Sequence, residues 1–288
     1  MKPLIGAHIS IAGGLPAGKA GIENTPIRAK EEGCETFQCF TRSPQGGVKQ
    51  ELSEKQIGEF ESNMKKSGIE RFVIHAPYTI NLASEIPRIR HSSISIIRDE
   101  LERGTKLGAD FVMFHPGSCR GQPRPSAIAS VQKSLEQILD KYNGTTELLV
   151  EISAGAGEVL GSTFTENADM ISVVKSARGF GGICFDTCHA FASGYDFRTT
   201  EKAQAILEEF DRTIGLNLLK LSHVQDSKTD LGGKRDRHEH IGGGFIGDGL
   251  KALLDTKEFR HIDWILETES DGRNEDIKHL KYIRDSHK

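Results

Sequence analysis

Histidine, aspartate and glutamate recur at the ends of short apolar runs in this chain, as in FVIH, LLVE and WILE. Imidazole nitrogens and carboxylate oxygens are ligands that zinc-like divalent ions favour. Five imidazoles and four carboxylates are more than one ion needs, so the set predicts a site for several ions. The candidate ligands are His75, His115, Glu151, Asp186, His189, His223, Asp236, His238 and Glu267.

The spacing of these residues supports a shared site more strongly than any one of them does. A single histidine at the end of an apolar run is more often a hydrogen-bonded core residue than a ligand. Glu151 is a stronger candidate, because an unpaired carboxylate that ends a buried run is energetically expensive. Asp186 and His189 lie three residues apart across a predicted strand-to-helix turn, so both can face one cavity. Asp236 and His238 alternate, as extended residues that face one side do.

Eight short apolar segments alternate with amphipathic stretches and predict a (β/α)8 barrel. Their nearly continuous apolar character is typical of parallel strands that are covered on both faces. The active site of such a barrel forms at the carboxyl ends of the strands, which is where the candidate ligands lie. An open doubly wound sheet fits less well, because its sites gather at one switch point. The predicted strands are residues 4–10, 35–40, 71–76, 110–115, 147–152, 181–187, 218–224 and 263–268.

Three of the intervening stretches predict helices with clear boundaries. In residues 53–68, Ser53 is the predicted N-cap, Gln56 completes a capping box, and Gly68 ends the helix. Residues 87–108 and 164–177 follow the same amphipathic pattern.

The length of 288 residues and the absence of a linker-like segment predict one domain over residues 1–288. A net charge of −4 argues against nucleic-acid binding through bulk charge. Three divalent ions would nevertheless outweigh the four ligand carboxylates and leave a positive pocket. The net charge therefore does not decide the class of substrate.

The cysteines and the N-terminal residues indicate a cytoplasmic protein. Five cysteines are scattered without a CxxC pair, so we expect no disulfides and a reducing compartment. MKPLIGAHIS shows no signal-peptide core, and no apolar run approaches the ~18 residues that span a bilayer. Cys188, next to His189, is predicted to be an inert small side chain rather than a nucleophile.

Two glycine-rich segments do not predict a dinucleotide site. GGGFIG (242–247) matches GxGxxG but follows no buried strand, and AGAGEVLG (154–161) has a different spacing. Glycines at these places allow the backbone to approach a ligand at the mouth of the barrel. Residues 228–240, KTDLGGKRDRHEH, predict a mostly solvated loop.

Five motifs that run almost from end to end of the chain resemble the endonuclease IV family of AP endonucleases. They are GAHISIAGG (6–14), FHPGS (114–118), FDTCHAFASGYD (185–196), DRHEHIGGGFIG (236–247) and ILET (265–268). The resemblance implies a (β/α)8 TIM barrel of the xylose-isomerase-like superfamily that cleaves double-stranded DNA on the 5′ side of abasic sites. The products would be a 3′-hydroxyl and a 5′-deoxyribose phosphate, and blocked 3′ ends would also be cleaned. We further expect a monomer.

The resemblance also implies three zinc ions, with manganese as an alternative at one site, and a role for each ligand. His75, His115 and Glu151 would hold the first ion. Glu151 would bridge to a second ion, completed by Asp186, His223 and Glu267, and would orient the attacking hydroxide. His189, Asp236 and His238 would hold the third.

The resemblance places DNA contacts at His8, Gln45, Tyr78 and Thr79, and this chain departs from the family pattern near some of them. Gln45 and Gly47 stand where the family often has an arginine that wedges into the DNA and a tryptophan. Tyr78 keeps an aromatic ring, whereas Thr79 replaces an apolar residue. A further departure is Glu151-Ile152-Ser153-Ala154-Gly155-Ala156-Gly157, against the common E-N-T-A-G-Q-G. We expect the metal chemistry to be kept and the grip on DNA to be altered.

Two other functions are compatible with the same barrel. A xylose-isomerase-like sugar isomerase or epimerase also uses carboxylate and histidine ligands, but it has no need of a third set formed by His189, Asp236 and His238. A non-enzymatic binder of DNA lesions would gain nothing from a bridging Glu151.

Overall fold

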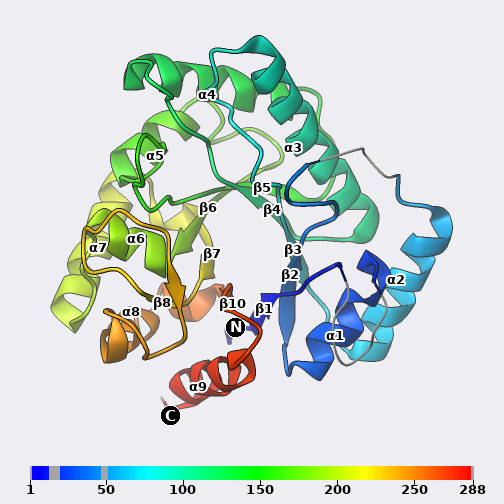
Figure 1. Ribbon diagram of the computed structural model, residues 1–288, viewed down its shortest axis with the longest axis vertical. Helices are drawn as coiled ribbons and strands as arrows, with labels where there is room; N and C mark the ends of the chain where they lie inside the picture. Colours follow the sequence, from blue (N-terminus) through cyan, green and yellow to red (C-terminus); the bar gives the residue numbers. More distant parts are fainter. Residues whose placement is uncertain (1, 13–19, 47–50, 287–288) are drawn as a thin grey trace.

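Eight parallel strands close into a barrel, with neighbours in the order β1-β10-β7-β6-β5-β4-β3-β2 (Figure 1). The computed structural model describes residues 2–12, 20–46 and 51–286. The barrel strands are β1 (Ile5–His8), β2 (Thr36–Cys39), β3 (Phe72–His75), β4 (Phe111–Phe114), β5 (Glu147–Glu151), β6 (Phe180–Asp186), β7 (Leu219–His223) and β10 (Asp263–Leu266). All eight predicted strands are confirmed. A two-stranded antiparallel hairpin, β8 (Asp226–Ser227) with β9 (His238–Glu239), was not predicted.

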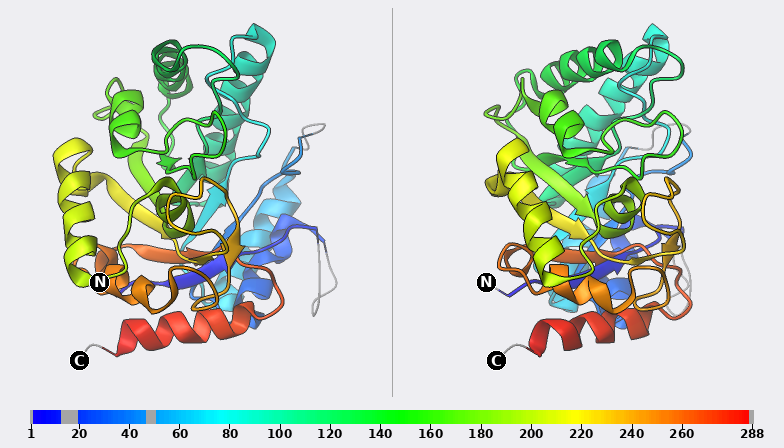
Figure 2. Two further views of the ribbon diagram at one scale, coloured as in Figure 1. Left: turned by 60° about the vertical axis from the view of Figure 1, so that its left-hand side comes forward. Right: turned by 90° about the vertical axis from the view of Figure 1, so that its left-hand side faces the viewer.

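The helices lie outside the barrel, and the two ends of the described chain meet on one side (Figures 1 and 2). Lys2 Nζ lies 2.6 Å from the carboxylate of Asp285 at the end of the last helix. The helices are α1 (Thr25–Glu31), α2 (Glu54–Ser67), α3 (Pro87–Leu107), α4 (Arg124–Leu139), α5 (Phe164–Ile171), α6 (Thr187–Ser193), α7 (Thr200–Thr213), α8 (Leu250–Leu254) and α9 (Arg273–Asp285). Short 3-10 turns η1 (Ile22–Asn24), η2 (Leu216–Leu218), η3 (Gly247–Gly249) and η4 (Phe259–His261) connect some of them.

The predicted signals at the ends of α2 are confirmed. Ser53 and Gln56 form the reciprocal capping box, and Gly68 ends the helix in the left-handed conformation at φ 73°. The helix predicted over residues 164–177 is wrong in length, since α5 ends at Ile171. The Ser172 hydroxyl donates to the carbonyl of Asp169 at 2.8 Å, which offers the backbone an alternative to a further helical turn.

The inside of the barrel holds a small apolar cluster of its own, separate from the larger core between strands and helices. It consists of one inward residue from each of six strands: Val73, Met113, Leu149, Cys184, Leu221 and Ile265. Cys34, Cys39, Cys119, Cys184 and Cys188 are free and buried. Among the described residues, no helix is long and apolar enough to cross a membrane.

Candidate metal centre

Each of the six inward residues of the barrel interior lies two positions before a candidate ligand. Successive side chains of a strand point to opposite faces, so residue i+2 returns to the inside one layer higher. The residues reached in this way are His75, His115, Glu151, Asp186, His223 and Glu267. The strand pattern therefore forms a polar layer directly above an apolar floor.

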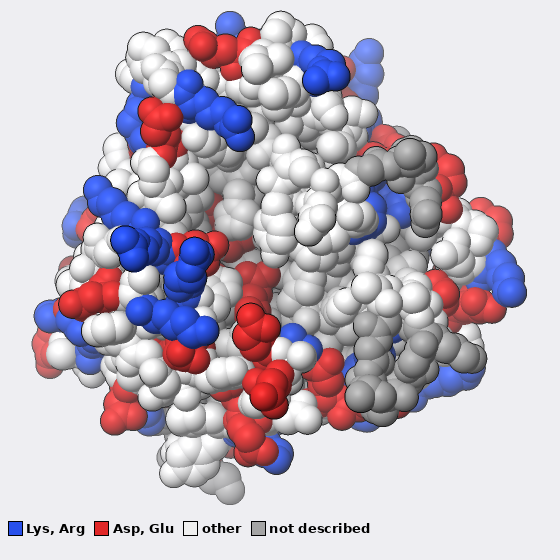
Figure 3. Space-filling view, in the orientation of Figure 1, with Lys and Arg blue, Asp and Glu red and all other residues white. Residues whose placement is uncertain are grey.

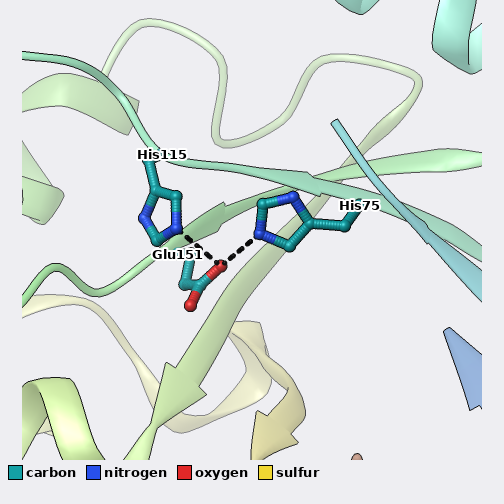
Figure 4. Close-up of side chains that lie close together, drawn as sticks. All are labelled: His75, His115 and Glu151. Carbon is teal, nitrogen blue, oxygen red and sulfur yellow. Dashed lines mark ion pairs between the residues drawn. The ribbon is translucent and has the colours of Figure 1, made fainter. Parts of the chain in front are cut away.

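Glu151, at the end of β5, is the centre of this layer and is completely buried. Its Oε2 lies 3.3 Å from His75 Nε2 and 3.6 Å from His115 Nε2, and both rings point toward it (Figure 4). Its Oε1 lies 3.0 Å from His223 Nδ1 and 3.3 Å from His189 Nδ1. Four imidazoles thus surround one carboxylate, and its two oxygens face different neighbours.

Three groups of candidate ligands have donor atoms close enough together to share an ion, and they agree with the sets that the family resemblance implied. The groups are His75, His115 and Glu151; Glu151, Asp186, His223 and Glu267; and His189, Asp236 and His238. A fourth combination, Asp186, Cys188 and His238, overlaps two of them. All nine predicted ligands are therefore brought together.

The third group is assembled from the short helix α6 and the loop that leads into β9. Asp186 caps α6 by accepting from the backbone N–H of His189 at 2.7 Å, which turns the His189 ring into the barrel mouth. Asp236 Oδ1 lies 3.2 Å from His189 Nε2 and 3.1 Å from His238 Nε2. The predicted alternation of Asp236 and His238 toward one side is confirmed.

Backbone carbonyls orient several of the imidazoles. Nδ1 of His75 lies 2.6 Å from the Ala76 carbonyl oxygen, and Nδ1 of His189 lies 2.9 Å from that of Ile152. A carbonyl can only accept, so Nδ1 carries the proton and Nε2 is left as the free donor atom toward an ion.

Two buried glutamines complete the layer, and neither was predicted from the sequence. Gln38 Oε1 accepts from His223 Nε2 at 2.7 Å, while Gln38 Nε2 donates to Glu267 Oε1 at 2.6 Å. Gln225 Nε2 donates to Asp186 Oδ2, and Gln225 Oε1 accepts from the backbone N–H of Glu267 at 3.3 Å. In β2, the neighbours Phe37 and Cys39 belong to the larger core between strands and helices, so the strand alternation turns Gln38 toward the inside of the barrel.

The protonation of the cluster reflects its mixture of acids and imidazoles. Burial and the neighbouring imidazoles lower the pKa of His115 to about 4, so this ring is neutral at pH 7. Burial opposes the charged form of His189, but the carboxylates of Asp186, Asp236 and Glu151 outweigh it and raise its pKa well above the usual value. Binding of a metal ion would release the protons that now balance the carboxylates.

The donor set fits divalent metal ions. His75 Nε2, His189 Nε2 and Glu151 Oε2 are buried and have no hydrogen-bond partner among the described residues. Buried polar atoms are normally hydrogen-bonded, so three such atoms without a hydrogen bond in one small region fit the coordination of a cation. Imidazole and carboxylate donors suit zinc or a similar ion.

The residues predicted to contact DNA lie around the opening of this layer, with different exposure. Tyr78 is 62% exposed and lines both a cleft of about 510 Å³, with Thr79, and a second cavity of about 320 Å³, with His8. Gln45 is exposed in the turn after β2. His8 is half-buried, and its Nδ1 lies 3.7 Å from Glu267 Oε1, so it contacts the ligand layer itself. Gly47 lies outside the described residues.

The loop that carries Gln45 is anchored and positioned by the body of the protein. The Arg42 guanidinium pairs with Glu100 of α3, and Thr41 donates to the same buried carboxylate at 2.5 Å. The Pro44 carbonyl then accepts from the backbone N–H of Tyr78 at 3.1 Å.

Replacing Gln38 by leucine should weaken metal binding about 10- to 100-fold, because His223 and Glu267 would lose the group that orients them. The affinity for zinc can be measured by competition with a chromophoric chelator. Gln122→Leu is the matched control: Gln122 is also buried, but it donates to the Ala83 carbonyl. Equal zinc affinity in Gln38→Leu and Gln122→Leu would show that Gln38 does not support the centre.

Comparison with known proteins identifies the family of this chain. The family model described as Xylose isomerase-like TIM barrel matches residues 27–286. The protein named "Probable endonuclease 4" of Carboxydothermus hydrogenoformans is 38% identical over 282 residues, which cover 98% of this chain and 96% of that protein. The crystal structure of endonuclease IV from Thermus thermophilus matches with a TM-score of 0.81 and 33% identity over 98% of both chains. A D-tagatose 3-epimerase-like protein matches with a TM-score of 0.72 at 20% identity, over 98% of this chain and 97% of that one, which shows a common fold alone. By these matches the chain belongs to the endonuclease IV family of xylose isomerase-like TIM barrels, and it is a nuclease-class hydrolase.

Proposed function

We propose that this protein is a zinc-dependent AP endonuclease that hydrolyses the phosphodiester on the 5′ side of abasic sites in double-stranded DNA. The products would be a 3′-hydroxyl and a 5′-deoxyribose phosphate, and the same centre would remove groups that block 3′ ends. The proposal rests on one observation above all: in a chain of the endonuclease IV family, Glu151 is shared by two of three adjoining ligand groups. We further propose that residues 1–288 act as one domain, as a monomer in the cytoplasm.

The proposed centre would hold three zinc ions, one of which manganese could replace. His75, His115 and Glu151 would hold the first; Glu151, Asp186, His223 and Glu267 the second; and His189, Asp236 and His238 the third. Bound divalent ions make water a nucleophile near neutral pH and neutralise the charge that develops on phosphate oxygens.

Glu151 would bridge and orient rather than store a proton. Burial opposes its ionisation, but His115, His223 and His189 outweigh this and hold its pKa well below the usual value. As an ionised carboxylate, Glu151 could accept a hydrogen bond from the attacking water. The apolar floor formed by Leu149 and its neighbours excludes water from below.

The rim around the centre would bind the DNA. Tyr78 packs edge-on against Phe40, with ring centroids 5.4 Å apart, and Phe40 in turn lies 4.5 Å from the ring of His8. The large exposed face of the Tyr78 ring could therefore stack in the gap that a missing base leaves. Asp and Glu side chains lie in the middle of the face in Figure 3, and Lys and Arg gather beside them, where a phosphate backbone could be held.

Replacing Glu151 by glutamine should lower incision of a duplex with a single abasic site by about 10²-fold or more. The amide keeps the volume but bridges two cations poorly. Glu147→Gln, at the other end of the same strand, is the matched control and should retain activity. More than about a tenth of the original rate in Glu151→Gln would exclude this residue from the mechanism.

The purified protein should contain about three zinc ions per chain, and His189→Ala should remove about one of them. Metal content by mass spectrometry gives the count. His91→Ala, an exposed histidine on α3, should leave it unchanged. One or two ions per chain in a fully active enzyme would mean that the third group binds no metal, and would favour the sugar-isomerase alternative.

Tyr78→Ala should weaken binding to abasic DNA by about 1–3 kcal/mol, because Tyr78 would be the main stacking group. Incision at damaged bases should be poor relative to abasic sites, since an intact base costs more to flip. Gln45→Arg should improve binding to both substrates. Binding can be measured by fluorescence anisotropy at fixed salt, with Tyr282→Ala, exposed on α9, as the control. An unchanged affinity in Tyr78→Ala would rule out stacking at this position.

A further inference from the structure

Asp226 is a buried carboxylate that none of the three ligand groups includes. It lies three residues after His223 and begins the hairpin of β8 and β9. Each of its oxygens accepts two backbone N–H groups. Oδ1 accepts from Ser227 at 2.7 Å and Ile246 at 2.8 Å, and Oδ2 accepts from Gly247 at 2.9 Å and Gly244 at 3.0 Å.

Three of these four donors belong to the GGGFIG segment, residues 242–247. Successive backbone N–H groups in a glycine-rich turn form a concave site that commonly holds an anion. Here the anion is the chain's own carboxylate. A Cβ at Gly244 would clash with the Ser227 carbonyl oxygen and lie 2.6 Å from Asp226 Oδ1, so the close approach requires glycine. The hydrogen bonds from this segment to Asp226 therefore explain why it matches GxGxxG.

The same carboxylate is connected to the third ligand group through the hairpin. In the pairing of β8 with β9, Ser227 lies opposite His238. The backbone N–H of Lys228 donates to the Arg237 carbonyl at 2.9 Å, between the ligands Asp236 and His238. The backbone N–H of Phe245 donates to the Ser227 carbonyl at 2.9 Å. β9, which carries His238, is therefore joined to β8, and residues 244–247, which follow β9 in the chain, are joined to Asp226.

We propose that Asp226 is a positioning residue of the metal centre, which fixes residues 236–247 on the barrel and so holds His238 and Asp236 in place for the third ion. The proposal rests on the proposed metal centre. Asp226 itself would contact neither ion nor substrate. An asparagine at this position keeps the shape but replaces one acceptor oxygen by an NH2 group, which would face the N–H groups of the loop.

The test compares the zinc content and the amide hydrogen exchange of Asp226→Asn, of His189→Ala and of the unaltered protein. In Asp226→Asn, peptides from residues 236–247 should exchange faster, the third zinc should bind about 10- to 100-fold more weakly, and the other two ions should stay. Asp248→Asn, an exposed residue directly after the same segment, is the matched control and should change neither property. Gly244→Ala, which disturbs the carboxylate from the loop side, should reproduce the effect.

Three outcomes would overturn the proposal: unchanged exchange, faster exchange with the third zinc still bound at its original affinity, or loss of all ions with faster exchange throughout the barrel. The last would mean a general structural role. If His189→Ala also leaves the zinc count unchanged, the third ligand group is not a metal site. In that case the proposed centre fails first, and the positioning role of Asp226 fails with it.

Discussion

The buried charge of Glu151 is the constraint on which the rest of the site depends. A carboxylate removed from water costs several kcal/mol unless cations or hydrogen bonds compensate it. Here four imidazoles lie within 3.6 Å of its oxygens, yet Oε2 has no hydrogen bond among the described residues. The imidazoles keep this carboxylate ionised, and the Oε2 atom without a hydrogen bond remains available to a cation.

The barrel provides these ligands through a simple geometric rule. Closing eight strands brings their ends to one place, and the two-residue alternation places six of the nine candidate ligands directly above an inward residue such as Val73 or Leu149. The apolar layer anchors the ligands and keeps water from entering below them. Rigid strands hold a metal centre more precisely than loops can. The third group draws on elements outside the barrel strands, with His189 on α6, Asp236 in a loop and His238 on β9.

The sequence was sufficient for the parts of the structure that local patterns govern. Apolar runs predicted all eight strands, and the capping residues Ser53 and Gly68 predicted the ends of α2. Six of the nine candidate ligands stand out in the sequence because ionisable residues at the ends of buried runs are unusual. Gln38 and Gln225 were missed, because a neutral amide in a strand gives no such signal and its role depends on partners far away in the sequence. The role of Asp226 could not be predicted for the same reason, since its three loop donors lie about twenty residues further on.

Two of the departures from the family pattern, Ile152 and Ala156, lie beside the candidate ligands. Ile152 follows the inward Glu151, so its side chain points away from the ligand layer, while its carbonyl still accepts from His189 Nδ1. The change from asparagine to isoleucine therefore does not alter the orientation of His189, because its hydrogen bond goes to a backbone carbonyl, which every residue has. Ala156, which stands where the family commonly has a glutamine, instead lines the cleft beside Tyr78, where the shorter side chain removes a polar group and adds space. A centre fixed by strands and backbone carbonyls tolerates variation at its rim, so residues that line the cleft can change while the candidate metal ligands stay in place.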